Sequence, residues 1–166
     1  MQTPAPKDVY LGLRNMALRI TREKAGLAAT YAPTEPWGVI MDWVVSQATA
    51  TIIAFSNGHA SIYLSTGGGF IGGGESHESV RNAAKTMVAV AGEYQPHTHA
   101  TSEYPLPKKQ DEVVFYLLTD AGIFTASASK EDLSNHNHAL SKLHDAAQGI
   151  ITEYRLIEGK VGATCN

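Results

Sequence analysis

The chain has 166 residues, of which 43% are hydrophobic and 17% are charged, and its formal net charge is -3. We expect a single domain over residues 1–166, with loose tails at 1–6 and 160–166. The acidic balance and the lack of a basic run disfavour nucleic acid as a partner. No apolar run reaches the roughly 18 residues of a membrane helix, and the one cysteine, Cys165, cannot form an internal disulfide. A cytoplasmic protein without membrane contact is therefore expected.

The first element is predicted to be a helix from about Lys7 to Ala25. Apolar residues recur at helical spacing and indicate its buried face, with the arginines turned to solvent. The residues of this predicted face are Val9, Leu13, Met16, Ala17 and Ile20. Gly26 stands where a left-handed cap residue belongs, and Pro33 and Pro36 then bracket an irregular connection.

Residues 37–45 are apolar on both alternations apart from Asp42, which predicts a central strand covered on both faces. A hairpin is expected next, because the runs 50–56 and 59–66 flank Asn57-Gly58. A two-residue turn there would pair Phe55 with Ala60, Ile53 with Ile62 and Thr51 with Leu64. One face of the hairpin would then carry Phe55, Ile53, Ile62 and Leu64.

The stretch 65–76 contains six glycines and joins this hairpin to a second helix. The helix is predicted from an apolar stripe at intervals of three and four residues, with Ser76 positioned to cap its start. The stripe consists of Val80, Ala83, Ala84, Met87, Val88 and Ala91. Residues 95–111 show no usable periodicity and include three prolines, so a long loop is expected there.

A second hairpin is predicted from the runs 112–119 and 122–128 around Asp120-Ala121, with Gly122 free to adopt a positive φ angle. A last helix follows, capped by Ser134 or Asn135 and ended by Gly159. Its apolar stripe consists of Leu140, Leu143, Ala147, Ile150, Ile151 and Tyr154.

The predicted order is therefore helix, three strands, helix, two strands, helix, which indicates an α+β domain with a mainly antiparallel five-stranded sheet. This order resembles the profilin or roadblock type of domain, in which a five-stranded antiparallel sheet carries helices. The resemblance is one of architecture, and no family motif accompanies it. The roadblock order places two strands before its middle helix, where three are expected here.

The glycine-rich stretch has the spacing of a dinucleotide-binding fingerprint at Gly67 to Gly72, but the strand before it belongs to an antiparallel hairpin. A looser anion site is an alternative, because backbone amides at a helix start attract negative charge, although Glu75 would compete with a phosphate. The candidate ligand-binding residues are Gly67, Gly68, Gly69, Gly72, Gly73, Gly74, Ser76 and Arg81. The favoured interpretation is a structural loop whose glycines allow close approach of its own chain or of a partner.

Seven histidines raise the question of a metal site, yet His97-Thr98-His99 and His136-Asn137-His138 lack the further ligands of a complete shell. No metal and no other cofactor are therefore expected. No catalytic residue is assigned either, because the stretch from Gly74 to Glu78 lacks the closing glycine of a nucleophile elbow. Asp42 is the carboxylate of most interest, since an acid in an apolar strand must be paired or hydrogen-bonded. A pocket joining Asp42, a histidine and Ser76 would favour a hydrolase.

These patterns favour a non-enzymatic cytoplasmic interaction domain that forms a homodimer or binds another protein. The alternative is a module that binds a small anionic ligand, such as a phosphate or nucleotide, at the glycine-rich loop. Under that alternative the amides of Gly72, Gly73, Gly74 and Ser76 hold the anion with help from Arg81.

Overall fold

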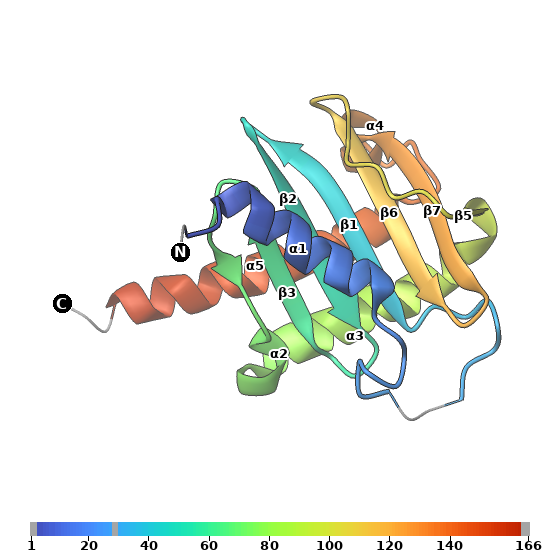
Figure 1. The fold of residues 1–166 in the computed structure, drawn as a ribbon, viewed down its shortest axis with the longest axis horizontal. Helices are drawn as coiled ribbons and strands as arrows, with labels where there is room; N and C mark the ends of the chain where they lie inside the picture. Colours follow the sequence, from blue (N-terminus) through green and yellow to red (C-terminus); the bar gives the residue numbers. More distant parts are fainter. Residues whose placement is uncertain (1–2, 28–29, 164–166) are drawn as a thin grey trace.

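A computed structural model describes residues 3–27 and 30–163, which form one antiparallel sheet with helices on both faces (Figure 1). The helices are α1 (Pro6–Arg19), α2 (Gly73–Ser76), α3 (Glu78–Tyr94), α4 (Lys130–Ser134) and α5 (Ser141–Ala163), with a short 3-10 helix at Gln95–His97. The strands are β1 (Gly38–Val45), β2 (Ala48–Phe55), β3 (Ala60–Leu64), β4 (Gly69–Phe70), β5 (His99–Thr101), β6 (Glu112–Thr119) and β7 (Gly122–Ser129).

The α+β class and the antiparallel sheet are confirmed, but the prediction of five strands is wrong. The sheet has seven strands in the order β4-β3-β2-β1-β6-β7-β5. The two strands that the sequence did not indicate, β4 and β5, are short and lie at the two edges. Segments of two or three residues are too short to show an alternating pattern, so their pairing was visible only in the fold. The short helices α2 and α4 also depart from the predicted order.

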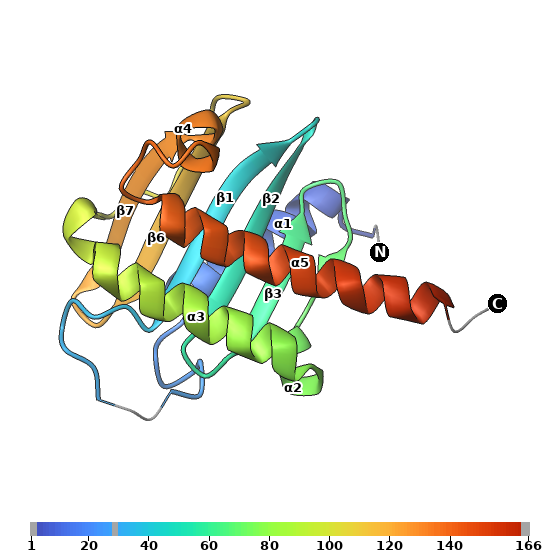
Figure 2. The ribbon, with the colours of Figure 1, turned by 180° about the vertical axis from the view of Figure 1, so that it is seen from behind.

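The sheet divides the hydrophobic core into two layers, one on each face and each covered by helices. Helices α3 and α5 cover one face of the sheet, and α1 crosses the other face (Figures 1 and 2). The first core, beneath α3 and α5, includes Met41, Ile52, Met87, Phe115 and Leu143. The second, beneath α1, includes Tyr10, Leu18, Ile40, Ile53 and Tyr116. On the α1 face of the sheet, the segment that joins β5 to β6 crosses over β6 and β7 (Figure 1).

The central strand is confirmed. Strand β1 pairs with β2 on one side and β6 on the other, and residues 38–43 are buried. Because both of its faces are covered, apolar residues occupy both alternations of the strand. Asp42 is the one acid among them, and its exposed fraction is 0%.

The predicted register of the first hairpin is wrong by one residue. Ala60 pairs with Ala54 rather than Phe55, and Ile62 pairs with Ile52 rather than Ile53. The reason is a longer turn, in which the Phe55 amide donates to the His59 carbonyl across residues 56–58. A slip of one residue exchanges the two faces of a strand. Ile53 and Phe55 therefore lie on the α1 side, whereas Ile62 and Leu64 lie on the side of α3 and α5.

The prediction of the second hairpin, by contrast, is confirmed, and so is its two-residue turn. Thr119 pairs with Gly122, whose φ angle is +122°. The two intervening residues are the ones that the sequence indicated, so the register of β6 and β7 follows from the turn alone.

Helix α1 differs from its prediction in length and in its buried face. It ends at Arg19, and Gly26, at φ +75°, closes a separate turn at 22–26. The residues that it buries are Tyr10, Arg14, Ala17 and Leu18. Val9 and Met16 of the predicted face are instead 47% and 61% exposed. The helix is turned this way because the Arg14 side chain reaches the acid on β1.

Helix α3 buries the predicted stripe, except that Ala83 is half-buried. Ser76 does not cap it, because the helix begins at Glu78 after His77, which makes no side-chain capping bond. Helix α5 begins later than its predicted caps and runs through Gly159 to Ala163. The helices of the described residues include none with the length and hydrophobicity to cross a membrane.

Candidate functional site

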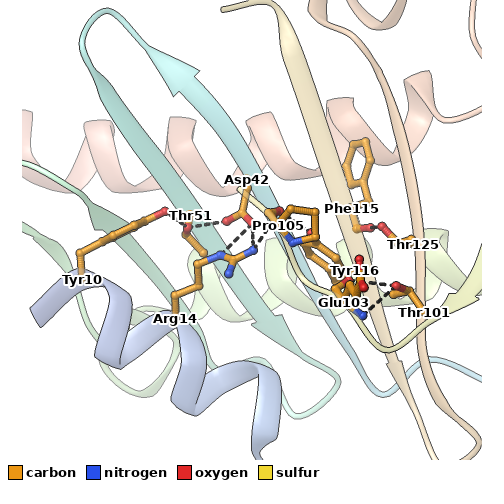
Figure 3. A network of polar contacts seen from close by, with 10 residues as sticks. All are labelled: Tyr10, Arg14, Asp42, Thr51, Thr101, Glu103, Pro105, Phe115, Tyr116 and Thr125. Atoms are coloured by element: carbon orange, nitrogen blue, oxygen red, sulfur yellow. Dashed lines mark hydrogen bonds and ion pairs between the residues drawn. The ribbon is translucent and has the colours of Figure 1, made fainter. Parts of the chain in front are cut away.

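Asp42 is held in a buried polar network beneath α1 (Figure 3). Arg14 donates to its Oδ2 atom from Nε at 2.9 Å and from Nη2 at 2.6 Å. Thr51 donates to Oδ1 at 2.5 Å, and the Tyr10 hydroxyl lies 2.8 Å from the Thr51 oxygen. Both carboxylate oxygens therefore have donors, which is what a fully buried acid requires.

The same network reaches the segment that joins β5 to β6. The Arg14 guanidinium lies 5.5 Å from the centre of the Tyr116 ring, and the Tyr116 hydroxyl donates to the Pro105 carbonyl at 2.6 Å. Arg14 Nη2 approaches that carbonyl at 3.5 Å. One arginine thus connects α1, the central strand and a long surface segment (Figure 3).

Burial dominates the electrostatics of this network. It raises the pKa of the Asp42 carboxyl, and the hydrogen bonds from Arg14 and Thr51 oppose that rise. Burial, with the Asp42 charge second, raises the pKa of Tyr10 and of Tyr116 to about 12. Arg14, Asp42, Tyr10 and Tyr116 are each at most 2% exposed, so a substrate could not reach them without opening the fold. The network therefore has a structural role, because it holds α1 against the central strand.

The glycine-rich stretch forms the β3–β4 turn and α2. Gly67, Gly68 and Gly69 have φ angles of +98°, +86° and +133°, which favour glycine over any other residue. Gly72, at φ +69°, precedes α2, which contains Gly73, Gly74 and Ser76. The structure thus divides the predicted ligand-binding glycines and Ser76 between a tight turn and a short helix, whereas Arg81 lies on α3.

Two of the predicted amide donors and the predicted cation bind the protein itself. The Gly72 amide donates to Ser61 Oγ at 3.2 Å, and the Gly73 amide donates to the Tyr154 hydroxyl at 3.2 Å. Arg81 donates to the carbonyls of Gly74 and Glu75 at 2.9 and 3.0 Å. The predicted cation of the anion site therefore binds the carbonyl end of α2.

Close contacts explain three of the glycines. A Cβ atom at Gly69 would collide with the Ile62 carbonyl, and one at Gly74 would collide with the Gly58 carbonyl. At Gly73 it would collide with the Tyr154 ring, whose hydroxyl also donates to the Ala60 carbonyl at 2.8 Å. Tyr154 was recognised in the sequence only as part of an apolar stripe, because nothing local indicates which backbone its hydroxyl will meet.

A groove of about 440 Å³, here called the α1 groove, separates α1 from the glycine-rich turn. Its lining is mainly apolar and includes Val9, Leu13, Tyr63 and Ile71. Ile71 is 73% exposed, the largest exposure among the large hydrophobic residues of the described chain. Beside it lies a more polar hollow in which His59 Nδ1 is 3.6 Å from Glu75 Oε1 and which Ser76 also lines. Ser76 thus lies on the surface, whereas Asp42 is buried.

The two histidine pairs lie apart on the surface. His97 and His99 flank the start of β5, and His136 Nε2 lies 3.0 Å from Asp145 Oδ2 near α5. Within residues 3–27 and 30–163, no group of three or more His, Cys, Asp and Glu side chains is arranged to hold a metal ion. Cys165 lies outside the described residues.

Comparisons with protein-family models, with curated proteins and with solved structures find no match to this chain. The functional argument therefore rests on the site geometry.

Proposed function

We propose that the protein is a non-enzymatic interaction domain that forms a homodimer, with α1 and the glycine-rich turn as the contact surface. The observation that carries this proposal is the exposure of Val9 and Met16, which flank Leu13 in an apolar stripe of α1. Val9, Leu13 and Met16 recur at the spacing of a buried face, yet Val9 is 47% and Met16 is 61% exposed. Exposed apolar residues gathered on one surface are typical of protein contact sites.

The glycine-rich turn supports the same surface. Val9 and Ile71 both line the α1 groove, so these two exposed side chains belong to one area, and Met16 lies farther along the same helix. The buried ion pair of Arg14 and Asp42 holds α1 in a fixed orientation, and a preorganised surface loses less entropy on binding. A second copy presents the same stripe, and such self-complementary patches are the basis of twofold dimers.

Light scattering after gel filtration tests the dimer, and the mass of two chains is the expected result. Ile71→Glu and Met16→Glu should each yield the mass of one chain, because an isolated carboxylate is unfavourable in an apolar contact. Leu156→Glu is the matched control, since Leu156 is also exposed, at 53%, but lies on α5 across the sheet. A single-chain mass for the wild type at every concentration would contradict the proposal.

The alternative function, binding of a small anion at the glycine-rich loop, has less support. The amides of Gly72 and Gly73 already donate to Ser61 and Tyr154, and Arg81 already binds two carbonyls. A thermal-shift panel of inorganic phosphate, nucleotides and sugar phosphates separates the two functions. A ligand at a hundred times its Kd adds about 2.7 kcal/mol of stability, so a clear rise in melting temperature would favour the anion site.

A further inference from the structure

A second groove, of about 580 Å³, runs along α5 on the face of the sheet opposite α1. We call it the α5 groove. Strands β1 to β4 form its floor, and α4 stands at one end. The helix contributes one stripe, which includes His144, Gln148, Ile151, Arg155 and Glu158. From His144 to Glu158 an α-helix rises about 21 Å, so the groove is elongated.

The floor of the α5 groove is apolar. Trp43 from β1, Ile62 from β3 and Phe70 from β4 line it. The Phe70 ring stacks on Tyr154 of α5 at 4.6 Å between ring centres. Ligand sites of small molecules have this composition, a mostly apolar wall with a few polar groups, and volumes of about 300–1,000 Å³.

The α4 end of the groove holds one cation, Lys130, and one carboxylate, Asp145. Lys130 makes no ion pair with any other described residue, and the nearby Asp145 carboxylate is engaged by His136 Nε2 at 3.0 Å. At the other end, Arg155 and Glu158 lie one helical turn apart on α5, and their opposite charges offset each other. An anionic group is therefore favoured beside Lys130.

His144 adds a polar group at the same end. It is 5% exposed, its Nε2 atom lies 3.2 Å from Gln148 Nε2, and its Nδ1 atom, 4.0 Å from Asp145 Oδ1, has no hydrogen-bond partner among the described residues. Burial lowers the pKa of His144, which keeps the ring neutral at pH 7. Buried polar groups without a partner are uncommon in folded proteins, and a bound molecule is one reason for them.

We infer that the α5 groove binds an elongated small molecule with an apolar body and one carboxylate group. The body lies along Trp43, Ile62 and Phe70, and the carboxylate lies at Lys130. Helix α5, which lines this site, and α1, which forms the proposed dimer contact, lie on opposite faces of the sheet (Figure 2). Leu64 lines both grooves.

Tryptophan fluorescence tests the site with dodecanoate as the probe. The chain has two tryptophans, and Trp37 lies in the other core, beneath α1. In the Trp37→Phe variant, dodecanoate should change the emission of Trp43 with a saturable curve, and it should raise the melting temperature of the wild type. In the Trp43→Phe variant, the emission of Trp37 should stay constant.

The carboxylate assignment has its own control. Lys130→Gln should weaken dodecanoate binding about 3- to 5-fold, the effect of one partly exposed ion pair, and leave the weaker binding of dodecanol unchanged. Lys142→Gln is the matched variant, because Lys142 is an exposed lysine of α5 outside the groove. It should bind dodecanoate like the wild type.

Three results would overturn the inference. The first is constant emission and melting temperature with dodecanoate up to its micelle threshold. The second is equal weakening by Lys130→Gln and Lys142→Gln. The third is a dodecanoate response of Trp37 in the Trp43→Phe variant, which would locate the ligand on the α1 face.

Discussion

Asp42 shows how one buried acid organises its surroundings. Its carboxylate is fully buried, and its bond to Arg14 fixes which face of α1 meets the sheet. An ion pair of this kind adds little net stability over apolar residues of the same shape, whereas breaking it leaves an unpaired buried charge. The sequence indicated that Asp42 needs a partner, and the identity of that partner depended on an arginine 28 residues away.

The Arg14 and Asp42 pair gives a stability prediction. Arg14→Met should lower the free energy of unfolding by about 3–5 kcal/mol, because Asp42 is then buried without its cation. Arg19→Met, at an exposed position of the same helix, should change it by less than about 0.5 kcal/mol. Urea unfolding followed by circular dichroism measures both values.

A double variant separates pairing from packing. Arg14→Met combined with Asp42→Leu should recover part of the loss, since no charge then remains buried. If the double variant lost as much stability as the two single variants together, the pair would not act as a unit.

The tyrosines of the network predict a loss of stability in alkali. Their pKa values are raised from 10.0 to about 12 in the folded protein, so between these pH values the folded chain holds protons that the unfolded chain releases. Stability is therefore complete below pH 10 and falls as pH rises towards 12, by up to about 2–3 kcal/mol for each tyrosine. Urea unfolding at stepped pH measures this slope, which should become shallower in Tyr10→Phe and in Tyr116→Phe. An unchanged slope in both variants would assign the loss to other groups.

At the scale of the elements, close packing and turn geometry explain most of the glycines in the glycine-rich stretch. Gly69, Gly73 and Gly74 each lie against another backbone or ring, and Gly67 and Gly68 supply positive φ angles in the β3–β4 turn. The sequence predicted that something occupies the space beside these glycines. The occupants are Tyr154 and the carbonyls of Gly58 and Ile62.

Two glycine substitutions should act in opposite directions. Gly74→Ala should destabilise the protein by at least about 2 kcal/mol, because its methyl group would overlap the Gly58 carbonyl, which is backbone and cannot turn away. Gly92→Ala should stabilise it by about 0.5–1 kcal/mol, because Gly92 is an exposed helix residue with open space around it. Thermal unfolding of both variants checks the difference, and a stable Gly74→Ala variant would show that the contact is not required.

The two hairpins show when local sequence determines register. Asp120-Ala121 before Gly122 forms the short turn that the sequence indicated, and the pairing of β6 with β7 follows from it. Asn57-Gly58 predicted an equally short turn, but the connection spans residues 56–59 and the register shifts by one. Both turns contain a positive φ glycine, so the glycine alone does not determine the loop length.

At the scale of the whole molecule, the sheet separates two surfaces. The α1 groove and the exposed Val9, Met16 and Ile71 lie on one face, and the α5 groove lies on the other. Substitutions at Ile71 and at Lys130 therefore test the dimer and the ligand site separately. The open edges of the sheet are the short strands β4 and β5, which offer few backbone groups for pairing with another chain.

By itself the sequence determined the class of the domain, the central strand, the second hairpin and the apolar stripes of α3 and α5. These features depend on periodicity and turn chemistry, which act over a few residues. Tertiary structure decided the seven-stranded sheet, the register of the first hairpin, the face that α1 buries and the partners of the glycines. Those depend on contacts between segments far apart in the chain. The stripe of Val9, Leu13 and Met16 depends on both. The sequence determines its spacing, whereas the exposure of Val9 and Met16 follows from the bond between Arg14 and Asp42, which are far apart in the chain.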